Sequence, residues 1–155
     1  MEIKIIMLIN LLAYSVIVSQ SFLYMLALRN VQKTMQAASY IELRKLLDKN
    51  FQAKFRIVFY TSLVTCTVLT ILCSMHLTGL LFITSATALT GLVAETILIV
   101  KGNLPINKII NTWTPENYPP DWQMYRSKWL SIFAQRQAAN IIGFLSLLVG
   151  AVFGS

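Results

Sequence analysis

The sequence predicts an all-α fold, a four-helix transmembrane bundle with a helical cap on its cytoplasmic side. Hydrophobic residues make up 56% of the 155-residue chain and charged residues only 12%, whereas soluble domains average about 45–50% and about 25%. The apolar residues concentrate in four runs, and most basic residues lie between these runs. We therefore expect one integral membrane domain with spans at residues 5–28, 57–75, 77–100 and 132–153.

The first run is long enough to cross a hydrocarbon layer of about 30 Å. It exceeds the apolar core of a signal peptide, usually about 7–15 residues, and no small-residue cleavage motif ends it before Arg29. The second and third runs predict a helical hairpin, because only a short turn with His76, Thr78 and Gly79 separates them. The last run reaches spanning length when its helix extends backward through Ile132.

The two long connections, residues 29–56 and 101–131, carry most of the Lys and Arg residues. The positive-inside rule places both in the cytoplasm and both termini on the opposite side. The first connection predicts a helix that lies on the membrane surface or extends the spans, with a solvated linker as the alternative. In the second connection, residues 102–107 predict the end of one helix and the start of another. The three prolines within residues 114–120 predict an extended segment, and Asp121 suits the start of the last helix.

The composition excludes several classes of protein. It argues against a disordered, collagenous or disulfide-rich chain and against a free cytosolic enzyme. The net charge of +7 is accounted for by cytoplasmic loops, and no basic module with interleaved aromatic residues indicates nucleic-acid binding. Cys66 and Cys73 lie in one apolar run and are expected to be small buried residues. Because His76 is the only histidine and no metal-binding motif is present, we expect neither a metal site nor a cofactor.

Glu95 is the only acidic residue inside a predicted span. A carboxylate in hydrocarbon is costly, so such residues face a bundle interior or water and are functional candidates. One interpretation makes Glu95 a proton carrier, a base or a ligand anchor. The other makes it structural, because Lys101 follows closely and Glu95 would pair with Arg126 or Arg136 at the cytoplasmic end. The sequence leaves both interpretations open.

Polar residues form a stripe on the first span. Tyr14 and Gln20 belong to it, and at 3.6 residues per turn its members occupy about one third of the helix circumference. The full set is Asn10, Tyr14, Gln20, Ser21 and Tyr24. These side chains either hydrogen-bond to neighbouring helices or line a cavity for an amphipathic ligand.

Small residues mark the expected helix contacts. Gly91 shares the Glu95 face of the third span, and Gly143 and Gly150 lie on the last span with small residues four positions before them. Such spacings let two helices approach closely. The upstream part of the last helix is aromatic and cationic instead, which is typical of anchoring at a membrane interface.

The second connection and its flanks carry a resemblance to a known family. Its elements, in chain order, are Glu95, then Asn103-Leu104-Pro105-Ile106-Asn107-Lys108, Trp113, Trp122, Tyr125-Arg126, Trp129 and Arg136 before a glycine-containing span. This order resembles the DUF1772 or anthrone oxygenase-like family of small four-span membrane proteins, in particular its uncharacterised Bacteroidetes-type members. The resemblance implies a bacterial inner-membrane protein.

The resemblance also implies a candidate activity. Some fungal relatives are associated with cofactor-independent oxidation of anthrones to anthraquinones. Asn107, Trp129 and Arg136 would then be the positions of interest. Phe133 stands four residues after Trp129, where the family often has His, so the general base expected there is absent.

Two functions from different classes follow from these features. The first is a non-enzymatic subunit of a membrane complex, or a lipid-interacting subunit, that packs against the bilayer, a protein partner or a second copy. The second is a cofactor-independent oxygenase or oxidoreductase that admits an apolar aromatic or quinone-like molecule between the spans. The catalytic candidates are Glu95, Asn107 and Arg136, and the ligand-binding candidates are Trp129, Tyr125, Tyr14 and Gln20. A transporter is disfavoured, because there is a single intramembrane acid and no inverted repeat.

Overall fold

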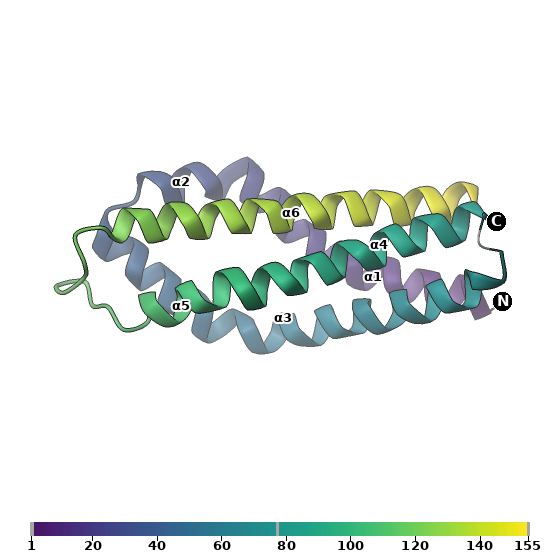
Figure 1. Ribbon diagram of the computed structural model, residues 1–155, viewed down its shortest axis with the longest axis horizontal. Helices are drawn as coiled ribbons and strands as arrows, with labels where there is room; N and C mark the ends of the chain where they lie inside the picture. Colours follow the sequence, from purple (N-terminus) through teal and green to yellow (C-terminus); the bar gives the residue numbers. More distant parts are fainter. Residues whose placement is uncertain (1, 77, 155) are drawn as a thin grey trace.

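The computed structural model describes the backbone of residues 2–76 and 78–154, and the side chains of all of these except residues 2, 51–54 and 76. The described chain is helical, and four of its helical rods are long and apolar enough to cross a membrane, namely Ile3–Thr34, Phe55–Cys73, Leu80–Ile110 and Trp122–Phe153. The rods lie roughly antiparallel, so both termini are at one end and the 111–121 loop is at the other (Figure 1). The all-α prediction is confirmed.

The elements follow one another with few interruptions. They are α1 (Glu2–Leu23), a π-helical turn (Tyr24–Leu28), α2 (Arg29–Thr34), α3 (Ala37–Cys73), a 3₁₀ turn (Ser74–His76), α4 (Leu80–Leu98), a second π-helical turn (Ile99–Asn103), α5 (Leu104–Ile110) and α6 (Trp122–Phe153). We call the end that holds α2, the first half of α3, α5 and the 111–121 loop the basic end. Its cytoplasmic location stays a prediction.

The first connection extends the spans rather than forming a separate helix. Residues 37–73 contain neither Gly nor Pro, so nothing in that stretch stops α3 from continuing into the second span. The one break lies at Met35 and Gln36, whose ψ angles of 143° and 157° are extended. The rods are therefore longer than the predicted spans at the basic end.

The expected helix stop at residues 102–107 is wrong. The π-helical turn carries α4 into α5 without a break, and Pro105, which has no N–H to donate, follows that turn directly as the second residue of α5. The last helix does begin where predicted, directly after Asp121. A π-helical turn holds one residue more than an α-helical turn and is frequent at functional sites.

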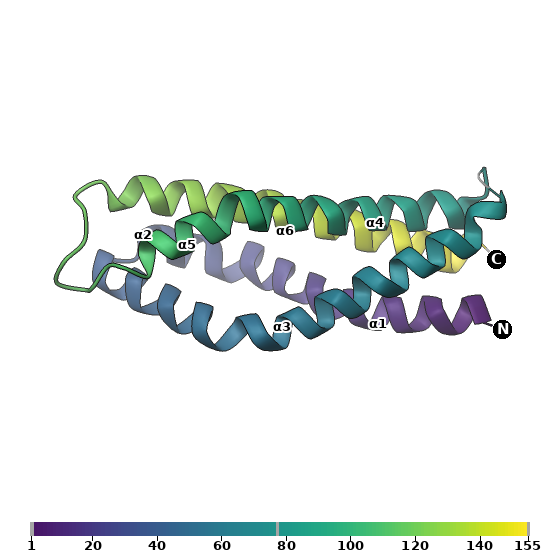
Figure 2. The same cartoon turned by 60° about the horizontal axis from the view of Figure 1, so that its bottom comes forward.

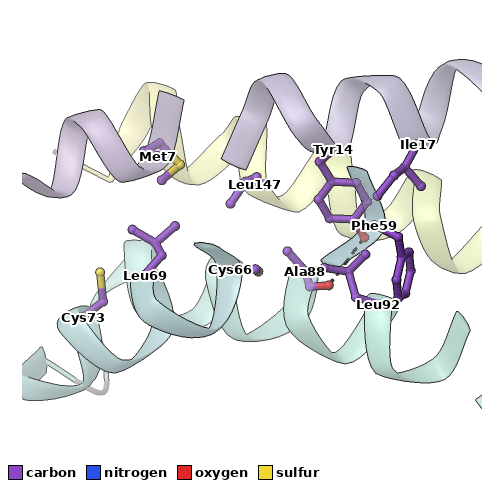
Figure 3. Packing of buried hydrophobic residues seen from close by; sticks show 10 residues of the cluster. All are labelled: Met7, Tyr14, Ile17, Phe59, Cys66, Leu69, Cys73, Ala88, Leu92 and Leu147. Atoms are coloured by element: carbon purple, nitrogen blue, oxygen red, sulfur yellow. Dashed lines mark hydrogen bonds between the residues drawn. The ribbon is translucent and has the colours of Figure 1, made fainter. Parts of the chain in front are cut away.

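Two apolar clusters hold the bundle together. The first lies between the spans and brings Tyr14 and Ile17 of α1 against Cys66 and Leu69 of α3 and Leu92 of α4 (Figure 3). The second lies at the basic end and is mostly aromatic; its larger members are Tyr24, Tyr40, Trp113, Trp129 and Phe133. Large apolar side chains also cover the outside of the spans, among them Leu12, Val64 and Ile142, each at least 60% exposed. Such an apolar exterior suits a lipid environment.

Glycines allow α4 and α6 to pack closely against each other. An added Cβ at Gly91 would lie 2.9 Å from the carbonyl oxygen of Ala139, and one at Gly143 would collide with the Tyr14 hydroxyl. Gly150 is equally confined, since its Cβ would meet the Thr84 side chain. The absence of a side chain lets the backbones of α4 and α6 approach at Gly91, and it leaves room for Tyr14 of α1 at Gly143 and for Thr84 at Gly150.

Candidate functional site

Glu95 and Arg136 form a buried ion pair. Glu95 lies near the end of α4 and is 1% exposed, and Arg136 lies in the middle of α6 and is 7% exposed. The Arg136 Nη2 donates to Glu95 Oε1 at 2.9 Å. Arg126, the other partner considered for Glu95, instead donates to the Met35 carbonyl at 2.7 Å. The acid and its partner therefore neutralise each other inside the bundle, as buried charges require.

Asn103 links this ion pair to the aromatic residues of the basic end. Its Oδ1 accepts a hydrogen bond from Arg136 Nη1 at 3.0 Å, and its Nδ2 donates to the Trp129 carbonyl at 3.1 Å. Asn103 is the last residue of the second π-helical turn and is 2% exposed. Arg136 is thus oriented by a carboxylate and an amide at once.

Asn107 makes a second set of bonds one helical turn further on. Its Oδ1 accepts from Arg44 Nη2 at 3.0 Å and from the Trp129 indole N–H at 2.8 Å. Its Nδ2 donates to Asp48 Oδ1 at 3.0 Å, and the other Asp48 oxygen accepts from Asn111 at 2.9 Å. We call Glu95, Arg136, Asn103, Asn107, Trp129, Arg44 and Asp48 the polar network.

Arg44 is the least expected member of the polar network. Its guanidinium carbon lies 3.7 Å from the centroid of the Trp129 ring, a cation–π contact. Burial lowers the pKa of Arg44, with nearby Arg136 acting in the same direction, while Tyr40 and Asp48 oppose the shift. Two guanidinium groups and two carboxylates make the polar network neutral when all four are ionised.

A cavity of about 490 Å³ adjoins the polar network. Its lining residues come from all four rods, and Figure 2 shows how α3 crosses close to α1 within the bundle. Its rim includes Leu23, Tyr60 and Val100, each more than half exposed and each on a different spanning rod. The remaining wall is mostly apolar except where polar side chains reach it, namely Arg44, Asp48, Arg56, Thr96, Asn103, Asn107, Trp129, Arg136, Gln20 and Gln32. We call this space the central cavity.

The residues singled out from the sequence divide into two groups. Four of them line the central cavity, namely Gln20, Asn107, Trp129 and Arg136. Glu95 does not line it but lies behind Arg136. Tyr14 is fully buried between the spans and donates to the Ala88 carbonyl at 3.4 Å (Figure 3). Tyr125 packs edge-on against Trp113 with ring centroids 5.3 Å apart.

Sequence reasoning missed Arg44, Asp48 and Asn103. A signal for them exists, because Arg44 and Asp48 are four residues apart, as are Asn103 and Asn107, so each pair shares one face of its helix. An amphipathic surface helix would expose such faces to water, whereas here they face each other. Among the residues that the structure describes, no three His, Cys, Asp or Glu side chains are grouped as a metal site would need.

Comparison with known proteins adds no relative. No family model, no curated protein and no solved structure matches the chain. The resemblance to the anthrone oxygenase-like family accordingly stays a prediction from the sequence.

Proposed function

We propose that this protein binds an amphipathic, lipid-like molecule in the central cavity. The observation that carries the proposal is that an apolar cavity with its rim on three spanning rods ends against the polar network. The apolar part of the ligand would lie among Leu28, Phe59 and Phe133, and its polar oxygen atoms would meet Arg44 and Arg136. A volume of about 490 Å³ is within the range of small-molecule sites, about 300–1,000 Å³.

Unpaired buried groups support this assignment. The Nε atoms of Arg44 and Arg136 and the Oε1 of Gln32 are buried without a hydrogen-bond partner within the described part of the chain. All three side chains line the central cavity. Buried polar groups are normally paired, so these three side chains have bonding capacity left for a ligand. Three guanidinium groups, those of Arg44, Arg56 and Arg136, line the central cavity against the single carboxylate of Asp48, so the lining favours a ligand head that presents oxygen acceptors.

Native mass spectrometry with an added monoacylglycerol, 1-oleoylglycerol, tests the proposal. Thr96 lines the central cavity, so the larger side chain in Thr96→Trp should fill part of it. We expect retention of the probe to fall at least about tenfold, which corresponds to a loss of about 1.4 kcal/mol in binding free energy. Thr90→Trp is the matched control, because Thr90 lies on the same helix, bonds its own helix in the same way and does not line the cavity. Equal retention by both variants would contradict the proposal.

A second candidate function is the cofactor-independent oxygenase. It is favoured by one observation: Asn107, Trp129 and Arg136, the positions implied by the resemblance, line one cavity. The catalytic base would have to be Asp48, which lines the central cavity, rather than Glu95, which does not. Conversion of a phenolic substrate under oxygen by the wild type, and its loss in Asp48→Asn with the fold retained, would support this candidate.

A further inference from the structure

We propose a second lipid site on the outside of the bundle, selective for an anionic phospholipid. The site is a groove of about 740 Å³ between α2 and the first half of α6, which lie side by side (Figure 1). It shares no lining residue with the central cavity and does not depend on the function proposed there. We call it the α2–α6 groove.

The charge of the α2–α6 groove selects the ligand. Arg29, Lys33 and Arg126 line it, and no acidic residue does. None of the three cations forms an ion pair with any side chain that the structure describes. Arg126 is held in place by its bond to the Met35 carbonyl and by the Trp122 ring, 4.5 Å from its guanidinium carbon. Three uncompensated cations match a phosphate that carries a net negative charge.

The position of the groove indicates a lipid rather than a soluble phosphate. Residues 135–153 of α6 rise about 27 Å at 1.5 Å per residue, close to the hydrocarbon thickness of about 30 Å. On the first rod, exposed apolar side chains such as Leu26 of the π-helical turn give way to Arg29 at the start of α2. The groove therefore lies where headgroups would meet the acyl chains.

The lining changes along the groove in the order that a phospholipid requires. Ser127 and Ser131 add hydroxyls beside the three cations, with Leu130 between them, whereas Ala134 and Ala138 continue the groove along α6 toward the span. No charged residue lines that part, and Gln135 is its one polar side chain. A phosphate would bind at the cationic part and an acyl chain would follow the small residues. Basic grooves between helices at a cytoplasmic membrane face commonly bind acidic headgroups.

The test compares two lipids with the same acyl chains, phosphatidylglycerol and phosphatidylcholine, by native mass spectrometry of the full chain. The wild type should retain one phosphatidylglycerol in preference to phosphatidylcholine. Arg29→Gln/Lys33→Gln should weaken phosphatidylglycerol binding about 30-fold, since each cation near a membrane surface contributes about a factor of five. Both side chains are exposed, so this double variant leaves the bundle core untouched.

Lys101→Gln/Lys108→Gln is the matched control, because it removes two exposed cations that line neither cavity. Retention of phosphatidylglycerol close to the wild-type level in this control supports the α2–α6 groove. An equal loss in both double variants would overturn the proposal, because binding would then follow total charge. Equal retention of the two lipids by the wild type, or displacement by glycerol phosphate without acyl chains, would overturn it as well.

Discussion

Removal of the Glu95 charge should destabilise the bundle strongly. In Glu95→Gln, Arg136 keeps its bond to Asn103 but loses its only carboxylate partner among the described residues. Breaking a buried ion pair from one side costs about 3–5 kcal/mol, because the remaining charge is left uncompensated. The amide oxygen of Gln still accepts a hydrogen bond from Arg136. We therefore expect a loss near the lower value, about 3 kcal/mol in the free energy of unfolding.

The double variant Glu95→Gln/Arg136→Gln separates coupling from general damage. It removes both charges, so no charge is left uncompensated. Its loss of unfolding free energy should be about 2 kcal/mol smaller than the sum of the losses in the two single variants, within the range for residues in contact. Denaturant titration in bicelles measures all three variants, and Thr90→Ala, an exposed position on the same helix, serves as the control. Single losses that add within about 0.5 kcal/mol would refute the reasoning.

Two further predictions concern packing and pH. Gly143→Ala should lower the free energy of unfolding by about 1–3 kcal/mol, because the added Cβ meets the Tyr14 hydroxyl. Most of that loss should disappear when Tyr14→Phe is introduced as well. An unchanged loss would show that the strain lies elsewhere. Burial raises the pKa of Tyr40 from 10.0 to about 12, so folding favours the neutral phenol. The corresponding stability is complete below pH 10 and is lost as the pH rises through about 12, by up to about 3 kcal/mol. Tyr40→Phe should lack this loss in unfolding titrations across that range, and a parallel decline in both proteins would contradict the assignment.

The spans could be predicted because they depend on local sequence. A helix in hydrocarbon satisfies its own backbone hydrogen bonds, so a long apolar run is enough to specify one. The same logic explains why α3 is continuous, since residues 37–73 contain no Gly or Pro. The stop expected at residues 102–107 was wrong because Gly102 lies inside a π-helical turn and Pro105 follows it directly, and the rod continues through both.

The candidate site could be predicted only in part. Glu95 and Arg136 stood out individually, as charges near apolar runs do, but Arg126 was an equal alternative partner. Helix rotation decides between such partners, and it is set by close contacts along the whole interface, such as those at Gly143. A residue pattern within one helix does not contain that information.

The sequence by itself determined that the chain forms long apolar helices, where they run, and which few polar side chains they carry. Only the tertiary structure decided that Arg44 meets Trp129 and that Asp48 meets Asn107, residues 85 and 59 positions apart. The physical reason is that contacts between helices set how each helix is rotated about its axis. For Asn107 the second π-helical turn adds to this, since one extra residue turns the following helix face by about 100°. The rotation of each helix determines which side chains meet across the bundle, and it follows from packing between helices rather than from the sequence within one.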